Sequence, residues 1–306
     1  MKSKLYKKKT IVLLGGPTAS GKSDLALDLA KLIDGEIINA DSMQVYKELK
    51  ILSARIDQKN YQNINHHLYG FHNVKKNFST GDWLILVVKK IEDLKKRKKT
   101  PILVGGTGLY FRSLLNGLVN IPNIPTRSRN KIRSLHKDLG QKNFYKKLLK
   151  LDPKSNNKID STDSQRSIRA YEVKYFTKKS IHDWFKETKS KFKKNEFIKI
   201  YIDFPRSELI QRINKRTEKM IKDGAVNEVK RFIKQNVRKS NSVNKAIGIA
   251  EIKKYLKNEK DLEDIKEEIS IKTRQYAKRQ RTWARGYMMN WLKLEPKDIN
   301  KFLKKI

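Results

Sequence analysis

Short apolar runs alternate with amphipathic stretches along the first third of the chain. The run Ile11–Leu14 is apolar at every position, as expected for a strand buried on both faces of a parallel sheet. In Lys22–Ile33, apolar residues recur at helical spacing on one face: Leu25, Ala26, Leu29, Ala30 and Ile33. The same criteria predict strands at Glu36–Asn39 and Pro101–Val104, with a helix between them at about Asp82–Lys98.

This alternation predicts an α/β fold in which helices flank a parallel sheet. Two further strands are expected late in the chain, at Phe197–Asp203 and Trp291–Leu294. Most of Ser207–Arg285 has a helical pattern. In such sheets the functional end is where the strands reach their carboxyl termini.

The pattern changes in the middle of the chain. Asn120–Pro125 is a proline-containing linker, and residues 127–199 then have the pattern of short basic helices, with 22 Lys or Arg against 8 Asp or Glu. We therefore predict two domains: an α/β core formed by residues 1–118 and 197–306, and an inserted all-α domain at residues 119–196.

Composition limits the class of protein. The 306 residues are 38% hydrophobic, which is typical of a globular chain, and the absence of cysteine excludes disulfides and Cys-ligated zinc. The basic start (Lys2, Lys4 and Lys7–Lys9) precedes an apolar run too short for a signal peptide, and no run is long enough to span a membrane. We expect a cytoplasmic monomer with no membrane partner.

The net charge of +39 and the pI of about 10.1 predict attraction to polyanions. Lysine is abundant throughout, however, which is also typical of proteins from AT-rich genomes, so the bulk charge leaves both explanations open. The uneven distribution favours nucleic acid, because residues 127–199 alone have a net charge of +14.

The first apolar run leads into a complete G-x-x-x-x-G-K-S phosphate-binding loop: Gly16, Pro17, Thr18, Ala19, Ser20, Gly21, Lys22 and Ser23. A strand before this loop and a helix after it let backbone N–H groups converge on an anion. Lys22 adds a positive charge, and the hydroxyl of Ser23 can reach a magnesium ion. The motif predicts binding of a di- or triphosphate.

Two polar groups follow other strands and are expected at the same edge of the sheet. Asp41 can hold magnesium, act as a general base or cap the N-terminus of a helix. Gly105–Gly108 contains Thr107 between glycines, which suits either a ligand or a strand-to-helix turn. Asp203 ends an apolar run like that of a magnesium-supporting strand, although Lys199 interrupts it. His66–His67 lacks a suitably spaced third metal ligand, so structural histidines are expected.

The segment Thr273–Arg285 has five basic residues and no acidic one. At helical spacing its cations form one stripe, namely Arg274, Lys278, Arg281 and Arg285. A second stripe is apolar: Tyr276, Ala277, Trp283, Ala284 and Tyr287. A helix that packs through its aromatic residues and presents cations to a phosphate backbone is one interpretation, and a solvated basic face is the other.

With these residues in place, the chain resembles the bacterial tRNA dimethylallyltransferases, also called tRNA isopentenyltransferases, of the IPP transferase family. The resemblance extends over nearly the whole chain. It rests on these segments: Gly15–Ser23, Asp41–Lys47, His66–Leu68, Leu103–Tyr110, Asp163–Arg166 with Arg169, Arg212 with Arg216, Ala246–Gly248 and Arg274–Arg285.

The resemblance implies a kinase-like, P-loop NTPase-like core that binds dimethylallyl diphosphate and Mg²⁺. The dimethylallyl group would pass to N6 of the adenosine just 3′ of a tRNA anticodon (tRNA position 37), and diphosphate would leave. The phosphate loop with Arg212 and Arg216 matches the diphosphate site. Asp41 matches the family's base and Thr107 a residue that positions the adenosine, while Ser23 and also Asp41 are candidates for holding the metal.

The resemblance also implies a surface for the tRNA anticodon stem-loop. Positions that match it, besides Thr107 and the Thr273–Arg285 cations, are Asp41, Ser42, Met43, Gln44, Arg129, Gln165, Arg166, Ser167, Ile168, Arg169, Lys245, Ala246, Ile247, Gly248, Ile249 and Ala250. Two segments depart from the family: Leu52–Ile56 replaces Gly-Thr-Ala-Lys-Pro, and Gly248–Glu251 lacks the usual aromatic residue and cation. The alternatives are an ATP-dependent small-molecule or nucleotide kinase and a non-catalytic RNA-binding protein.

Overall fold

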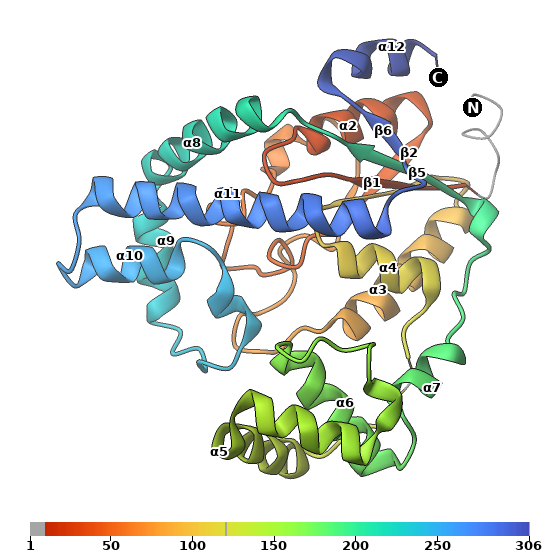
Figure 1. Cartoon of the computed structure of the whole chain (residues 1–306). Coiled ribbons are helices and arrows are strands. Elements are labelled where there is room, and N and C mark those ends of the chain that lie inside the picture. Colours follow the sequence, from red (N-terminus) through yellow and green to blue (C-terminus); the bar gives the residue numbers. More distant parts are fainter. Residues whose placement is uncertain (1–9, 120, 306) are drawn as a thin grey trace. The chain divides into compact units, whose positions relative to one another are not determined.

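The structure, a computed structural model, describes residues 10–119 and 121–305 (Figure 1). The basic stretch Lys2–Lys9 and the first linker residue, Asn120, lie outside the described residues. The chain divides into two compact units, one of which is Asn116–Lys191, while the other combines the segments on either side of it. No helix in the described ranges is both long and apolar enough to cross a lipid bilayer.

In the part of the larger unit that the structure describes, six parallel strands form the sheet, in the order β3-β2-β4-β1-β5-β6. Their bounds are β1 (Ile11–Gly15), β2 (Gly35–Asn39), β3 (His66–His67), β4 (Thr100–Gly105), β5 (Phe197–Ile202) and β6 (Leu292–Leu294). The predicted parallel sheet flanked by helices is confirmed. Each predicted strand had one or both ends wrong by one residue, and β3 was not predicted because two histidines carry no strand pattern.

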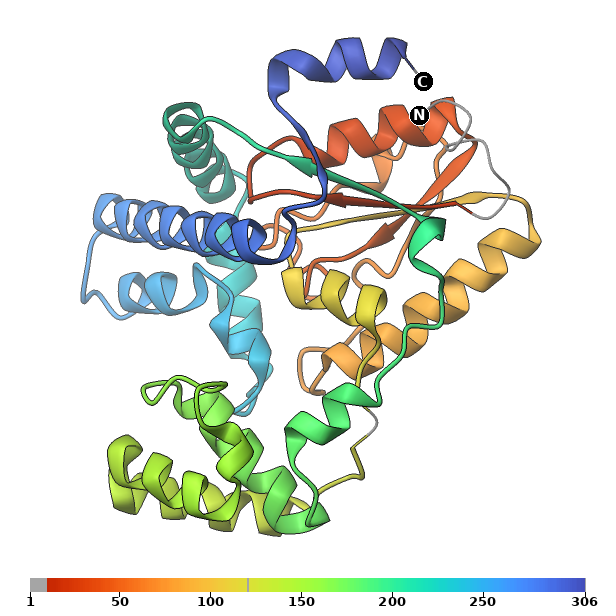
Figure 2. The ribbon, with the colours of Figure 1, turned by 45° about the vertical axis from the view of Figure 1, so that its right-hand side comes forward.

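Helices cover both faces of the sheet, which explains why β1 is apolar throughout (Figure 2). Val12 and Leu14 pack on the face of α2 (Lys22–Leu32), α8 (Arg206–Lys222) and α12 (Ile299–Lys304). Ile11 and Leu13 pack on the opposite face against α3 (Thr80–Lys96), α4 (Gly108–Asn116) and the end of α11 (Leu262–Tyr287).

A third apolar cluster joins α9 (Ala225–Ile233), α10 (Ile249–Leu256) and the start of α11 to the segment after β2. Each departure from the family pattern has a residue in this cluster, Leu52 and Ile249, and a Cβ on Gly248 would overlap Leu52. The buried carboxylate of Glu228 accepts hydrogen bonds from the N–H groups of Lys50, Ile51 and Leu52 at 2.8, 2.8 and 2.9 Å. The start of the altered segment is therefore held by the protein's own core.

The smaller unit consists of helices in its described residues: α5 (Thr126–Leu151), α6 (Ser164–Thr177) and α7 (Ile181–Lys186) with a short 3₁₀ turn. Gly140, with φ of 68°, breaks α5 into two segments. The helices enclose a core of their own that includes Phe144, Leu148 and Val173. A separate core in a separate compact unit is typical of an independent domain.

Glu36 ties β2 to β3 and to the end of α3. Its carboxylate is 4% exposed, accepts hydrogen bonds from Arg97 at 2.8 and 3.2 Å, and lies 2.6 Å from Nε2 of His67. Burial alone would raise the pKa of Glu36, but the hydrogen bonds from Arg97 and His67 outweigh it and lower this pKa to about 2. The ionised carboxylate therefore stabilises the fold.

We predict that Glu36→Gln lowers the free energy of unfolding at pH 7 by about 2 kcal/mol. Because the pKa of Glu36 is depressed by folding, this contribution is complete above pH 4.5 and is lost as the pH falls toward 2. Urea unfolding at pH 7 and at lower pH measures it. Asp93→Asn, which removes an exposed partner of the same Arg97, is the control and should barely shift the midpoint. Equal midpoints for Glu36→Gln and wild type would contradict this account.

Candidate active site

The phosphate loop connects β1 to α2 at the carboxyl edge of the sheet. Ala19 and Gly21 have left-handed φ values of 63° and 78°, which turn successive N–H groups toward one side. Gly21 is the N-cap of α2 and offers no side-chain cap. The first N–H groups of the helix therefore lack partners within it and can bind an anion.

Three cations converge on this loop. Lys22 Nζ donates to the carbonyl of Pro17 at 2.8 Å, Arg212 Nε to that of Ala19 at 2.7 Å, and Arg216 Nη1 to Thr18 Oγ1 at 2.8 Å. The two arginines come from successive turns of α8. The structure thus brings together the residues that the sequence assigned to a diphosphate.

The pKa of Lys22 is lowered to about 8: burial is the largest cause, the charge of Asp41 opposes it, and the positive charge of Arg216 adds to the lowering. Burial also lowers the pKa of Arg216. Two partly buried cations with one nearby carboxylate form a site short of negative charge. An anionic ligand supplies that charge and favours the protonated form of Lys22.

Asp41 lies beside the phosphate loop. Its Oδ1 accepts the N–H of Met43 at 2.9 Å. The helix N-cap alternative was wrong, because Asp41 stabilises a turn and no helix begins there. Asp41 also lines a cavity of about 160 Å³ together with Lys22, Ser23 and Arg216. The carboxylate can therefore both stabilise its own turn and face a ligand held by the loop.

Thr107 contacts Ser42, the residue that follows Asp41. Its Oγ1 accepts the N–H of Ser42 at 3.0 Å and lies 3.3 Å from the Ser42 hydroxyl. The ends of β2 and β4 thus bring the Asp41–Ser42 and Thr107 motifs together, as predicted from parallel strands.

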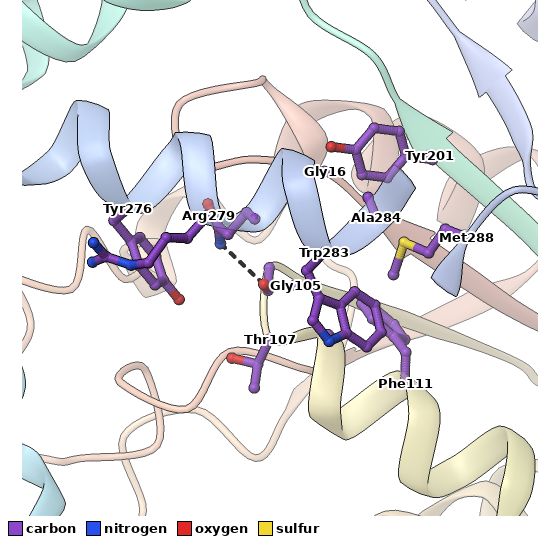
Figure 3. A pocket seen from close by; sticks show the side chains of 13 residues that line it. Gly16, Gly105, Thr107, Phe111, Tyr201, Tyr276, Arg279, Trp283, Ala284 and Met288 are labelled. Carbon is purple, nitrogen blue, oxygen red and sulfur yellow. Dashed lines mark hydrogen bonds between the residues drawn. The ribbon is translucent and has the colours of Figure 1, made fainter. Parts of the chain in front are cut away.

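A second cavity of about 190 Å³ lies between α4, α11 and the strand ends (Figure 3). Aromatic side chains line much of it, and Gly105 lines this cavity as well as that of the phosphate loop. A Cβ on Gly106 would overlap the amide of Gln280, and one on Gly108 would overlap the indole of Trp283. The glycines of this turn therefore make room for α11.

The two predicted stripes of α11 have different neighbours. Tyr276, Trp283 and Ala284 face the aromatic cavity (Figure 3). Tyr287 is 51% exposed and stacks on Trp283, so its predicted burial was wrong: it lies in the last turn of the helix. The cations line a groove of about 420 Å³ against α8, namely Arg274, Lys278, Arg281 and Arg285.

The other metal candidates have protein partners. Asp203 lies 3.7 Å from Arg281, an ion pair at the groove side of α11. His66 Nδ1 lies 2.8 Å from the carbonyl of Ile64, and His67 pairs with Glu36, so both histidines have the structural role that was expected. In the described ranges, no three His, Cys, Asp or Glu side chains are grouped to hold a metal ion.

The residues that match tRNA-contacting positions of the family differ in solvent exposure. Gln165 and Arg166 of the smaller unit are exposed, whereas Ser167 is fully buried and accepts from Gln141 at 3.2 Å. In the larger unit Lys245 and Ala250 are exposed, and three residues between them are buried: Ala246, Gly248 and Ile249. The remaining positions, Ser42, Met43, Gln44, Arg129, Ile168, Arg169 and Ile247, are partly buried. The buried side chains support the exposed ones rather than offering a surface to RNA.

Sequence reasoning missed one connection at this site, made by Gln280 of α11. Gln280 accepts the N–H of Thr18 at 2.8 Å and donates to the carbonyl of Gly106 at 3.0 Å. The only signal in the sequence was that Gln280 lies within the basic helix, outside the stripe of Arg274, Lys278, Arg281 and Arg285.

Comparisons with known proteins place the chain in a family. A family model described as IPP transferase matches residues 44–287. A tRNA dimethylallyltransferase of Pelagibacter ubique is 57% identical over 300 residues, covering 98% of this chain and 96% of the relative. One of Rickettsia massiliae is 41% identical, covering 97% of this chain and 82% of the relative.

Solved structures are also similar. The full-length tRNA isopentenylpyrophosphate transferase from Bacillus halodurans gives a TM-score of 0.69 at 30% identity, covering 97% of this chain and 95% of that one. A eukaryotic dimethylallyltransferase, described in crystallographic snapshots as acting on tRNA, gives a TM-score of 0.80 at 28% identity. That match covers 94% of this chain and 73% of the other.

Proposed function

We propose that this chain, which belongs to the IPP transferase family, transfers the dimethylallyl group from dimethylallyl diphosphate to N6 of an adenosine in tRNA. The observation that carries the proposal is the convergence of Lys22, Arg212 and Arg216 on a phosphate loop beside Asp41. A leaving diphosphate needs such a group of cations, because negative charge develops on it as its bond to carbon breaks.

The larger unit, in this proposal, is a P-loop NTPase-like core, and the helical unit is an inserted all-α domain that binds tRNA. The loop geometry at Ala19 and Gly21 supports the first assignment. The surplus of basic residues in 127–199 supports the second.

The chemistry follows from the site. The N6 amine attacks the allylic carbon, a C–N bond forms, and the C–O bond to diphosphate breaks with its electron pair going to the leaving oxygen. An aromatic amine is a weak nucleophile because its lone pair is delocalised into the ring. Asp41 accepts the amine proton, and Thr107 positions the adenosine beside it. The target base must first leave its stack to enter the cavity, at a cost of a few kcal/mol.

Mg²⁺ is the metal ion that we propose for this site. It prefers oxygen ligands and binds through one or two protein groups together with substrate phosphates, retaining water. Ser23, exposed at the start of α2, would hold the ion, and Asp41 lines the same cavity. When bound, the ion would neutralise charge on the leaving diphosphate.

The tRNA region that we propose is the anticodon stem-loop, with the adenosine just 3′ of the anticodon as the target. If basic side chains bind its backbone, we predict that tRNA affinity falls at least about 100-fold between about 50 and 200 mM salt. Fluorescence anisotropy with labelled tRNA measures the slope of log affinity against log salt concentration. Arg166→Gln should reduce this slope by about 1, the contribution of one phosphate contact. A change of less than about threefold would exclude a phosphate-binding surface.

A kinase built on the same loop is the rival enzyme, and a non-catalytic RNA-binding protein is the other alternative. Incubation with dimethylallyl diphosphate and tRNA, and separately with ATP and nucleosides, distinguishes all three. We expect diphosphate release only in the first mixture. Consumption of ATP with phosphorylated nucleoside would establish a kinase, and no turnover in either mixture would favour an RNA-binding protein.

A further inference from the structure

Gln280 spans two loops that belong to different halves of the proposed reaction. Its Oε1 accepts the backbone N–H of Thr18 in the phosphate loop at 2.8 Å. Its Nε2 donates to the carbonyl of Gly106 at 3.0 Å, in the turn that also holds Thr107. A single amide thus joins the loop assigned to the diphosphate to the loop assigned to the adenosine.

The surroundings fix this amide in place. Gly106 approaches so closely that a Cβ would overlap Gln280 Nε2, so any side chain at position 106 would displace the amide. Tyr276, one turn earlier on α11, lines the same cavity as Gln280 and Thr107. Burial raises the pKa of Tyr276, so its hydroxyl stays protonated. The connection from Thr18 to the Gly106–Thr107 turn therefore runs through the Gln280 amide.

We propose that Gln280 is a positioning residue, which fixes the distance between the diphosphate-bearing carbon and the attacking amine by tying Thr18 to the Gly106–Thr107 turn. The inference rests on the proposed transfer reaction. Gln280 contacts neither reacting atom in this account, so it acts through the two loops. A misplacement of about 1 Å between reacting groups costs about 100-fold in rate, which sets the size of the expected effect.

The test is Gln280→Ala, with Gln275→Ala as the matched control. Gln275 lies on the same helix, is exposed and does not line the aromatic cavity in which Gln280 lies. We expect Gln280→Ala to lower kcat about 100-fold. The dissociation constants for pyrophosphate alone and for tRNA alone should change less than about threefold, because each loop keeps its own ligand groups. Gln275→Ala should match wild type in all three measurements.

A double-mutant cycle with Gly106→Ala tests the same connection from the other loop. The added methyl group should displace the Gln280 amide and lower kcat in the wild-type background. It should have little further effect in Gln280→Ala, where the overlapping atoms are gone. Additive losses would overturn the proposed connection.

Two other results are decisive. Wild-type transfer with unchanged kcat in Gln280→Ala would overturn the role of Gln280 and leave the proposed function standing. The same follows if pyrophosphate affinity and the melting temperature fall together with kcat, since Gln280 would then only support the fold. A wild-type protein that binds pyrophosphate but transfers no dimethylallyl group overturns both proposals.

Discussion

Asp41→Asn is expected to lower kcat for dimethylallyl transfer by about 1000-fold, within the range for loss of a general base. The amide of asparagine is nearly isosteric and keeps an oxygen that can accept the N–H of Met43, as Oδ1 of Asp41 does at 2.9 Å. The turn and the cavity therefore persist, and pyrophosphate affinity should not weaken. The loss should appear in kcat because only proton acceptance is removed. Single-turnover kinetics with labelled donor and tRNA measures it.

The same variant separates the two roles left open for Asp41. If Asp41 accepts the proton, the Mg²⁺ concentration for half-maximal activity should be unchanged in Asp41→Asn. A rise in that concentration, with activity restored at high Mg²⁺, would instead assign the carboxylate to metal support. Asp28→Asn, an exposed carboxylate on α2, is the control and should retain wild-type kcat. A kcat within threefold of wild type for Asp41→Asn would contradict its assignment to catalysis.

Lys22→Met is expected to weaken pyrophosphate binding by about 3 kcal/mol, or about 100-fold, because it removes a partly buried charge from an anion site. The pKa of about 8 for Lys22 adds a pH dependence. Binding requires the protonated amine, so affinity of the wild type should fall about tenfold from pH 7 to pH 9 as that proton is lost. In Lys22→Met this part of the pH dependence should be absent.

Isothermal titration calorimetry with pyrophosphate, from pH 7 to pH 9, measures both the loss of affinity in Lys22→Met and the pH dependence of the wild type. Pyrophosphate itself also titrates, but that contribution is common to wild type and Lys22→Met and cancels in their ratio. Lys31→Met, at the exposed last turn of α2, controls for general charge. Identical pH profiles for wild type and Lys22→Met would show that Lys22 does not face the anion.

The fold was predictable where the sequence pattern reflects burial directly. β1 and β4 are apolar because helices cover both faces of the sheet, and α2 shows its buried face at helical spacing. The predicted range of helix α3, Asp82–Lys98, was shifted from the observed Thr80–Lys96. The start of the helix depends on its cap, Ser79, whose hydroxyl accepts a hydrogen bond from the N–H of Asp82 at 3.2 Å. β3 has two residues, too few for periodicity to detect.

The site was predictable where one short segment contains the chemistry, as in the phosphate loop, or where a family motif marks it, as for Asp41 and Thr107. The tie through Gln280 was not predictable, because it joins Thr18 to a residue 262 positions away. The burial of side chains in the protein segments that match tRNA-contacting positions was also not predictable. A motif does not reveal that Ser167 or Ile249 packs inward. The roles of the site residues, the magnesium ion and the monomeric state stay predictions.

The most direct test of the central claim is mass analysis of the nucleosides of tRNA after reaction with dimethylallyl diphosphate and the purified protein. We predict one adenosine per modified tRNA that has gained a dimethylallyl group in place of an N6 hydrogen, located just 3′ of the anticodon, with an equal amount of diphosphate released. Unmodified adenosine throughout the tRNA, under conditions in which the protein binds both pyrophosphate and tRNA, would contradict the account.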